Sequence, residues 1–332
     1  MFSNKLAIST ISLGQHPSHS LDRKLTAAAQ AGYAGVEIVY SDLQTYSQSH
    51  GLSIADGAVK IKATCDDNKL KILSLAPFEN YEGDSSPLID RLQRAAHWIE
   101  TARILQSPYL QVPGQFKADA IGDEVVIVSE LRQLADLGSS KQPLVSIAYE
   151  PMSWSTYYST WESSLRLVEA VNRPNFGLCL DTFHLATKVW ADPFAVSGKI
   201  PDADQSLQET LCRFARECPL EKVFYIQLSD GVKFDPPFSE AHPWYLEGEA
   251  PQFTWSKHAR PFPLETHLGG YLPVTEIVRA WIGEKGFAGW TSLEIFDERM
   301  RQKNSRPESA ALRGIDSWKK IQLELQTPTT KL

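Results

Sequence analysis

The feature of this sequence that most constrains its fold is a regular alternation of short apolar segments with longer amphipathic segments. The apolar segments are typical of parallel strands buried on both faces, and the amphipathic segments are typical of the helices between them. The expected strands span residues 6–13, 35–40, 70–76, 109–112, 144–150, 176–180, 222–227 and 289–296. The expected helices span residues 21–31, 54–68, 86–105, 123–137, 157–171, 204–218, 274–285 and 310–325. Eight strand–helix units in succession predict an α/β protein, a (β/α)8 TIM barrel.

Two connections between these units are longer than the few residues usual in a compact domain, at 185–203 and at 230–273. Each follows a predicted strand, so each is expected at the C-terminal face of the barrel, where TIM barrels carry their active sites. We therefore expect residues 1–326 to form a single catalytic barrel domain, with 230–273 as a long active-site insertion after strand 7. Residues 327–332 are expected to be a flexible tail.

Composition narrows the class of protein and its partners. The 332 residues are 42% hydrophobic and 22% charged, as in ordinary globular proteins. A net charge of −7 without a cluster of Lys and Arg argues against nucleic acid as a partner. No apolar run approaches the roughly 18 residues of a membrane span, so no membrane partner is expected. Four cysteines without CxxC spacing and an N-terminus without a signal peptide favour reduced thiols and a cytoplasmic location.

Oxygen-bearing side chains end four of the predicted strands. Glu150, Asp181, Gln227 and Glu294 each follow an apolar run. Because the carboxyl ends of parallel strands meet at one end of a barrel, we expect these four side chains to lie together at its mouth. An all-oxygen set suits a hard divalent cation such as Mg²⁺ or Mn²⁺. The sequence therefore predicts a metal site there, although any one of the four could also be an ordinary strand-end residue facing water.

A histidine follows one of these residues closely. His184 lies three positions after Asp181, which places it beside the predicted metal without requiring it to be a ligand. Histidine titrates near neutrality and is the commonest proton-transfer group in enzymes. We expect His184 to be catalytic; the alternative is a loop histidine bonded to the backbone.

The long insertion contains a candidate site for a substrate carboxylate. Ser256 and Arg260 are four residues apart and would share one face of a helical turn, where a hydroxyl and a guanidinium suit a carboxylate. A surface arginine fits the same spacing. Phe78 and Tyr81 follow the third predicted strand and are expected to form part of the pocket wall. The substrate is thus expected to be a small carboxylate.

Common cofactor and nucleophile motifs are missing from the sequence. It contains no GxGxxG, GxxxxGK[ST], GxSxG or HExxH. This argues against a nucleotide cofactor, against serine acyl transfer and against a zincin-type zinc site.

These residues resemble the sugar phosphate isomerase/epimerase superfamily of xylose-isomerase-like TIM barrels, and within it the fungal-type 3-dehydroshikimate dehydratases of quinate catabolism. The similarity extends from residue 5 to about residue 318. Its most specific segments are FENYEG (78–83), YEPMSWS (149–155), RPNFGLCLDTF (173–183), KVFYIQ (222–227), GYLPV (270–274) and GWTSLEIF (289–296).

The resemblance implies a divalent metal (Mg²⁺, Mn²⁺ or Co²⁺) on the four strand-end residues, a catalytic His184, and substrate-carboxylate contacts near Ser256 and Arg260. It also implies a lyase that dehydrates 3-dehydroshikimate to protocatechuate through a metal-stabilised enediolate. The sequence departs from some bacterial dehydratases, which have a second histidine where Met152 stands here or an arginine where Glu79 stands.

Three other interpretations remain open at this point. A ketose or sugar-phosphate epimerase would use the same enediolate, but such enzymes typically carry histidine at the position of Gln227. A metal-dependent DNA-repair endonuclease would need several metal-binding histidines and a basic groove. A non-enzymatic binding module would leave the four strand-end oxygen donors unexplained.

Overall fold

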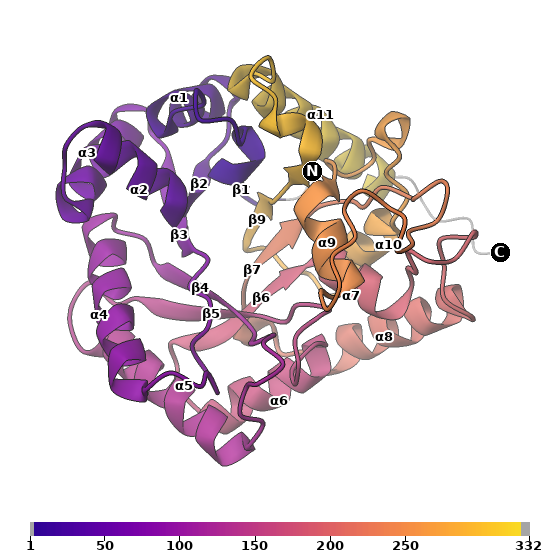
Figure 1. Cartoon of the computed structure of the whole chain (residues 1–332), viewed down its shortest axis with the longest axis horizontal. Coiled ribbons are helices and arrows are strands. Elements are labelled where there is room, and N and C mark those ends of the chain that lie inside the picture. Colours follow the sequence, from indigo (N-terminus) through magenta and orange to yellow (C-terminus); the bar gives the residue numbers. More distant parts are fainter. Residues whose placement is uncertain (1–2, 327–332) are drawn as a thin grey trace.

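The computed structural model describes residues 3–326, and its centre is a closed barrel of eight parallel strands (Figure 1). The predicted (β/α)8 TIM barrel is therefore confirmed. The barrel closes where β1 pairs in parallel with the last barrel strand, Ala7 opposite Ser292. In order around the barrel, the strands are β1 (Leu6–Ser9), β2 (Gly35–Val39), β3 (Lys71–Ala76), β4 (Tyr109–Pro113), β5 (Ser146–Glu150), β6 (Phe176–Asp181), β7 (Val223–Leu228) and β9 (Trp290–Leu293).

Helices surround this barrel in the ring seen in Figure 1. They are α1 (Leu21–Ala31), α2 (Tyr40–Ser49), α3 (Ile54–Asp67), α4 (Leu88–Ile104), α5 (Glu124–Ser139), α6 (Trp161–Val171), α7 (Thr182–Val189), α8 (Ala203–Glu217), α9 (Pro251–His258), α10 (Val274–Val278) and α11 (Pro307–Gln326). A π-helical segment, Arg279–Glu284, continues α10. Single-turn 3₁₀ helices lie at Thr10–Leu13, Leu220–Lys222, Thr266–Leu268 and Glu298–Arg301.

Local sequence signals define many of these elements. The Asp123 carboxylate accepts hydrogen bonds from two backbone N–H groups in the first turn of α5. Thr160 and Ser163 form a reciprocal capping box at the start of α6. Gly32 ends α1 in the left-handed conformation, with a φ of 97°. The strands consist almost entirely of buried residues, as expected when helices cover a parallel sheet.

Besides α9, which lies within the predicted insertion, two helices lie where none is expected from the sequence. The α2 segment is rich in Ser, Thr and Gln and has no clear apolar stripe, so hydrophobic periodicity does not reveal it. The α7 helix begins directly after β6, where the Asp181 carboxylate accepts the N–H of Phe183. The connection expected at 185–203 is correspondingly shorter, because its first part belongs to α7.

The insertion after β7 is built around one short strand pairing. Its strand β8 (Ala259–Arg260) pairs antiparallel with β10 (Phe296–Asp297), a two-residue strand that follows β9. The two ends of the insertion meet at Asp230, whose carboxylate accepts the backbone N–H groups of Gly231, Leu264, Tyr271 and Leu272 at 2.8–3.2 Å. Burial raises the pKa of Asp230 to about 6. The insertion is thus tied to itself at its base.

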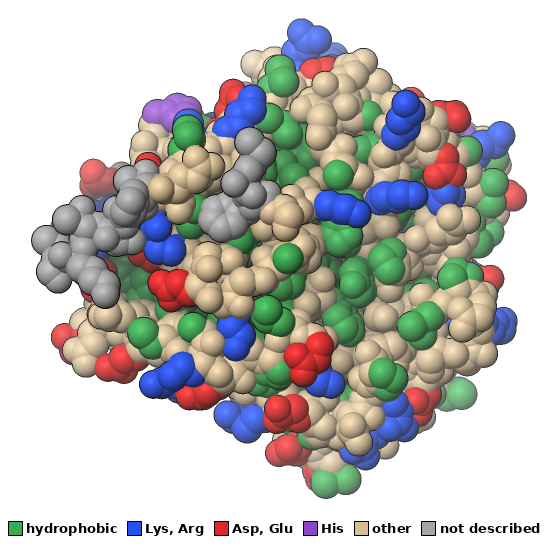
Figure 2. Space-filling model, turned by 180° about the vertical axis from the view of Figure 1, so that it is seen from behind, with side chains coloured by type: hydrophobic (Ala, Val, Ile, Leu, Met, Phe, Trp, Pro, Cys, Tyr) green, Lys and Arg blue, Asp and Glu red, His purple; other side chains and the backbone are tan. Residues whose placement is uncertain are grey.

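The exterior is mixed in character. On the face seen in Figure 2, Lys and Arg side chains are interspersed with Asp and Glu side chains and with hydrophobic ones. Within residues 3–326, no helix combines the length and apolarity that crossing a bilayer requires. The segment expected to be a tail, 327–332, lies outside the described residues.

Candidate metal centre and active site

The mouth of the barrel contains a cavity of about 260 Å³. Apolar side chains that follow the strands form much of its wall, among them Val39, Pro113, Met152 and Phe296. The charged side chains and imidazole that line it are Glu79, Glu150, His184, Lys257, Arg260 and Glu294. Because the strands are parallel, residues distant in the sequence meet here.

Three buried side chains in this region can hold a metal ion. Glu150 ends β5, Asp181 ends β6 and His184 lies in the first turn of α7; each offers one ligand atom within 4.8 Å of the others. The exposed fractions of these residues are only 2–4%. Within the described chain, Glu150 Oε1 has no hydrogen-bond partner, whereas Oε2 accepts the Gln111 amide N–H at 2.7 Å. A buried carboxylate oxygen left without a partner fits a cation ligand.

The pKa shifts of the buried carboxyl groups also indicate a cation site. Burial, together with the charge of nearby Asp181, raises the pKa of Glu150 well above its usual range. Burial and the charge of Glu150 likewise raise the pKa of Glu294, which directly follows β9. Several carboxyl groups in one buried place resist ionisation unless a cation compensates their charge. These residues therefore fit a divalent metal.

Gln227, the fourth strand-end residue, is fully buried next to Asp181 in the β6–β7 register. Its amide N–H donates to both carboxylate oxygens of Glu37 at 3.1 and 3.3 Å, and its amide oxygen accepts from the Cys179 thiol at 3.2 Å. Ser74 also donates to Glu37, at 2.7 Å. Gln227 is thus held by a polar layer inside the barrel rather than by the other three predicted ligands.

Arg260 binds two of the predicted metal ligands. Its guanidinium is 1% exposed, donates to the Asp181 carboxylate and lies 3.5 Å from Glu294 Oε2. It also donates to the hydroxyls of Ser229 at 2.7 Å and Ser256 at 3.1 Å. Arg260 is the cation of the carboxylate cluster in this structure.

The Ser256–Arg260 contact therefore exists, although the two residues do not share a helical turn. Helix α9 ends at His258, and Arg260 belongs to β8. The pairing of β8 with β10 aims the guanidinium at the mouth. Spacing alone gave the correct pair but the wrong local geometry.

His184 has a defined proton arrangement. The backbone N–H of Ser153 donates to Nδ1 at 3.3 Å, so the proton of the neutral ring lies on Nε2. Nε2 lies 3.4 Å from Glu150 Oε1. Burial lowers the pKa of His184 to about 3, which keeps the ring neutral. The edge of Trp154 packs against the ring at 4.7 Å between centroids.

Phe78 and Tyr81 do not line the mouth cavity, which corrects the expectation that they form its wall. Both are fully buried in the hydrophobic core, where the Tyr81 hydroxyl donates to the Glu130 carbonyl at 3.1 Å. Their neighbours Pro77 and Glu79 face the cavity instead. Trp154 also lines the cavity, a role that the sequence analysis does not assign to it; its place just after the strand ending in Glu150 is the signal that points there.

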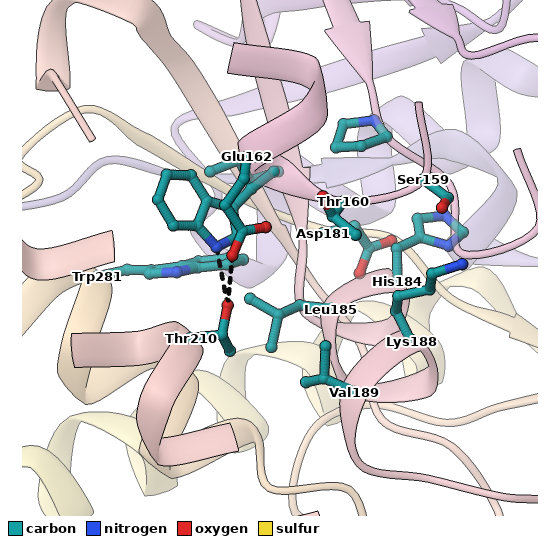
Figure 3. A pocket seen from close by; sticks show the side chains of 13 residues that line it. Ser159, Thr160, Glu162, Asp181, His184, Leu185, Lys188, Val189, Thr210 and Trp281 are labelled. Carbon is teal, nitrogen blue, oxygen red and sulfur yellow. Dashed lines mark hydrogen bonds between the residues drawn. The ribbon is translucent and has the colours of Figure 1, made fainter. Parts of the chain in front are cut away.

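A second cavity lies behind the cluster, between β6 and helices α6, α7 and α8 (Figure 3). Asp181 and His184 form one side of it, and a hydrogen-bonded chain of Trp161, Thr210 and Glu162 forms another, at 2.9 and 3.1 Å. Its volume is about 20 Å³, which suits a water molecule. Of these two cavities next to Asp181 and His184, the mouth cavity is the one with room for a substrate.

The chain was compared with known proteins. The family model for xylose isomerase-like TIM barrels matches residues 25–321. A 3-dehydroshikimate dehydratase of Neurospora crassa is 37% identical, over 98% of this chain and 95% of that protein. A 3-dehydroshikimate dehydratase of Pseudomonas aeruginosa is 28% identical over 97% of this chain, which spans only 43% of that longer protein. A solved fusion of a xylose isomerase-like TIM barrel with 4-hydroxyphenylpyruvate dioxygenase superposes with a TM-score of 0.75 at 26% identity, over 98% of this chain and 43% of the fusion.

Proposed function

The chain belongs to the xylose isomerase-like TIM barrel family, and from this premise we propose that it is a 3-dehydroshikimate dehydratase, a carbon–oxygen lyase that forms protocatechuate. The similarity to the Neurospora crassa enzyme covers nearly the whole of both chains, which supports this reaction directly. The observation that carries the proposal in the structure is the mouth cavity. It joins a carboxylate cluster suited to a metal with an arginine suited to a carboxylate substrate.

We propose Glu150, Asp181, Gln227 and Glu294 as the residues that hold a divalent ion, Mg²⁺, Mn²⁺ or Co²⁺. His184, which belongs to the buried group of possible ligands, is instead assigned to proton transfer, and Gln227 would bind the ion through the amide oxygen that here accepts from Cys179. The unpartnered Glu150 Oε1 and the raised pKa values of Glu150 and Glu294 support this assignment. A bound ion would supply Lewis-acid stabilisation of negative charge on the ketone oxygen and the neighbouring hydroxyl of the substrate.

Arg260 and Ser256 are proposed to bind the substrate carboxylate. A guanidinium with a neighbouring hydroxyl suits one carboxylate, and the two side chains already lie 3.1 Å apart. In this structure Arg260 neutralises Asp181 and Glu294. Once these carboxylates ligate an ion, the guanidinium is available to the substrate. The insertion at 230–273 positions both residues and contributes Phe253 and Lys257 to the cavity wall, which would limit the access of water to the reacting ring.

His184 is proposed to move the proton. Dehydration requires removal of the proton next to the ketone and departure of the hydroxyl one carbon further along the ring. The neutral ring presents Nε2 toward Glu150 and the mouth cavity, while the Ser153 N–H fixes its orientation. Because Nε2 carries the proton, His184 would deliver it from Nε2 to the departing hydroxyl, which leaves as water, and would take up at Nε2 the proton removed next to the ketone.

The test is direct. The purified protein, stripped with a chelator and reloaded with Mg²⁺, Mn²⁺ or Co²⁺, is given 3-dehydroshikimate. New aromatic ultraviolet absorbance should appear only in the metal-loaded samples, without any nucleotide. A parallel panel of ketoses and sugar phosphates is the control. Epimerisation of one of these with 3-dehydroshikimate untouched would overturn the assignment.

A further inference from the structure

One carboxyl group in the mouth cavity is not part of the metal cluster. Glu79 lies in the loop after β3 and lines the same cavity as His184 and Arg260. Its carboxylate makes no hydrogen bond and no salt bridge with any other residue between 3 and 326. Arg94, the cation whose charge acts on Glu79, donates instead to the backbone carbonyls of Glu79 and Asn80, at 2.7 and 2.6 Å. The Glu79 side chain thus retains its full hydrogen-bonding capacity.

Partial burial makes an unpartnered carboxyl group at Glu79 energetically unfavourable. The residue is half-buried, and burial raises the pKa of Glu79, a shift that nearby Arg94 only partly opposes. The charge of Glu79 also contributes to the raised pKa of Glu150. A carboxyl group placed in a cavity under these conditions is stabilised by any ligand that offers a hydroxyl group.

Each polar group of the proposed substrate can be assigned to a polar group of the cavity. In the proposed function, the carboxylate cluster with its ion binds the ketone end of the substrate, and Arg260 and Ser256 bind the substrate carboxylate. Among the other polar wall residues, Lys257 pairs with Glu249 at 2.6 Å and Ser41 is exposed at the rim. Gln111 donates through its amide N–H to Glu150, while its Oε1 and the indole Nε1 of Trp154 are buried without a partner in the described chain. Among the residues that line the cavity, Glu79 is the one carboxyl group outside the metal cluster, and it can form a hydrogen bond with the remaining ring hydroxyl.

We propose that Glu79 determines specificity by binding the ring hydroxyl that the reaction removes, an inference that rests on the proposed dehydratase function. Its position in the loop after β3 sets it apart from Arg260 and Ser256, which come from the insertion after β7. Because a carboxyl group repels a carboxylate, Glu79 also disfavours binding of the ring in the reversed orientation.

The test exploits the difference between substrate and product, since protocatechuate has lost exactly one group, the hydroxyl in question. In Glu79→Ala, kcat/KM for 3-dehydroshikimate should fall about 10- to 100-fold, the usual effect of losing a hydrogen bond to a charged group. The inhibition constant of protocatechuate should stay unchanged, as should metal affinity measured by calorimetry. Glu79→Gln keeps an acceptor oxygen and should lose less. The control is Glu276→Gln, at an exposed position on α10.

The outcomes separate this inference from the function on which it rests. A wild-type protein that forms no protocatechuate would overturn the proposed function, and the role of Glu79 with it. An active wild type whose Glu79→Ala variant keeps its kcat/KM would overturn the inference alone. So would a parallel loss of affinity for substrate and protocatechuate, because that result indicates a general disturbance of the cavity.

Discussion

Two buried arginine–carboxylate pairs occur among residues 3–326, and they differ in how completely their charges are matched. Between α4 and α5, Arg91 meets Glu130 in a two-pronged contact at 2.7 and 2.8 Å. Arg91 also donates to the backbone carbonyls of Ser86 and Tyr81, and Glu130 accepts the N–H of Gly83 at 2.7 Å. One positive charge meets one negative charge, and their hydrogen-bonding groups are satisfied locally.

At the barrel mouth, one guanidinium faces an excess of carboxylates. Arg260 contacts Asp181 and Glu294, and Glu150 adds a third carboxyl group with an oxygen that lacks a partner. The two regions are equally buried, so burial alone does not distinguish a structural pair from a functional one. Charge that is left unmatched distinguishes them, because only an additional cation stabilises the ionised cluster.

The largest effect is expected from Asp181→Ala. Loss of a proposed metal ligand should lower kcat by at least about 10³-fold, since the stabilisation of developing charge is worth several kcal/mol. The fold should survive, because Arg260 keeps Glu294 and Ser229 as partners. Initial rates with metal and thermal unfolding monitored by circular dichroism measure the two effects. Full turnover in the Asp181→Ala variant would show that the carboxylate cluster does not bind a catalytic metal ion.

Replacement of His184 is expected to have the next largest effect. His184→Ala should lower kcat by about 10²–10⁴-fold if Nε2 transfers the proton. Stopped-flow absorbance at saturating substrate measures the change, with metal affinity determined in parallel to exclude an indirect loss of the ion. A kcat equal to that of the wild type would assign the proton transfer to another group that lines the mouth cavity.

Glu130→Ala tests the matched pair. Removal of one partner leaves the buried Arg91 charge uncompensated, which should lower the free energy of unfolding by about 3–5 kcal/mol. Urea titration measures this loss, and the kcat of the folded fraction should not change. Replacing both partners, as Arg91→Met with Glu130→Leu, should recover much of the stability. A fall in kcat without a loss of stability would show that the Arg91–Glu130 pair, like the cluster at the barrel mouth, acts in catalysis.

The smallest effect is expected from Arg260→Ala. If the guanidinium binds the substrate carboxylate equally tightly in the ground state and the transition state, KM should rise about 10- to 100-fold while kcat changes little. Steady-state kinetics over a wide substrate range separates the two parameters, and Arg260→Lys should retain part of the affinity. A loss confined to kcat would instead place Arg260 at the reacting atoms.

Much of the fold could be predicted from the sequence, because burial imposes a clear pattern on barrel strands and on the helices that cover them. Helix α1 has the expected bounds, and β6 differs from the expectation by one residue. The elements that escaped prediction lack that pattern. The α2 segment has little apolar periodicity, and α7 follows β6 without an intervening turn.

The sequence predicts the candidate site only as far as the parallel direction of the strands fixes which residues meet. Parallel strands bring their carboxyl ends together, so Glu150 and Asp181 are expected to meet. The direction in which each side chain then points depends on contacts distant in the sequence. Gln227 is bound by Glu37 from β2, and Tyr81 is bound by Glu130 from α5. Neither partner can be identified from local sequence.

The tie at Asp230 has a consequence for how this protein can change over evolutionary time. Because one carboxylate joins the start of the insertion to Leu264, Tyr271 and Leu272, the chain leaves the barrel and returns to it at nearly the same point. Everything between can lengthen, shorten or be exchanged for another loop while the strands on either side keep their register. The barrel mouth can therefore acquire a different set of wall residues as a single interchangeable unit, while the barrel strands beneath stay in place.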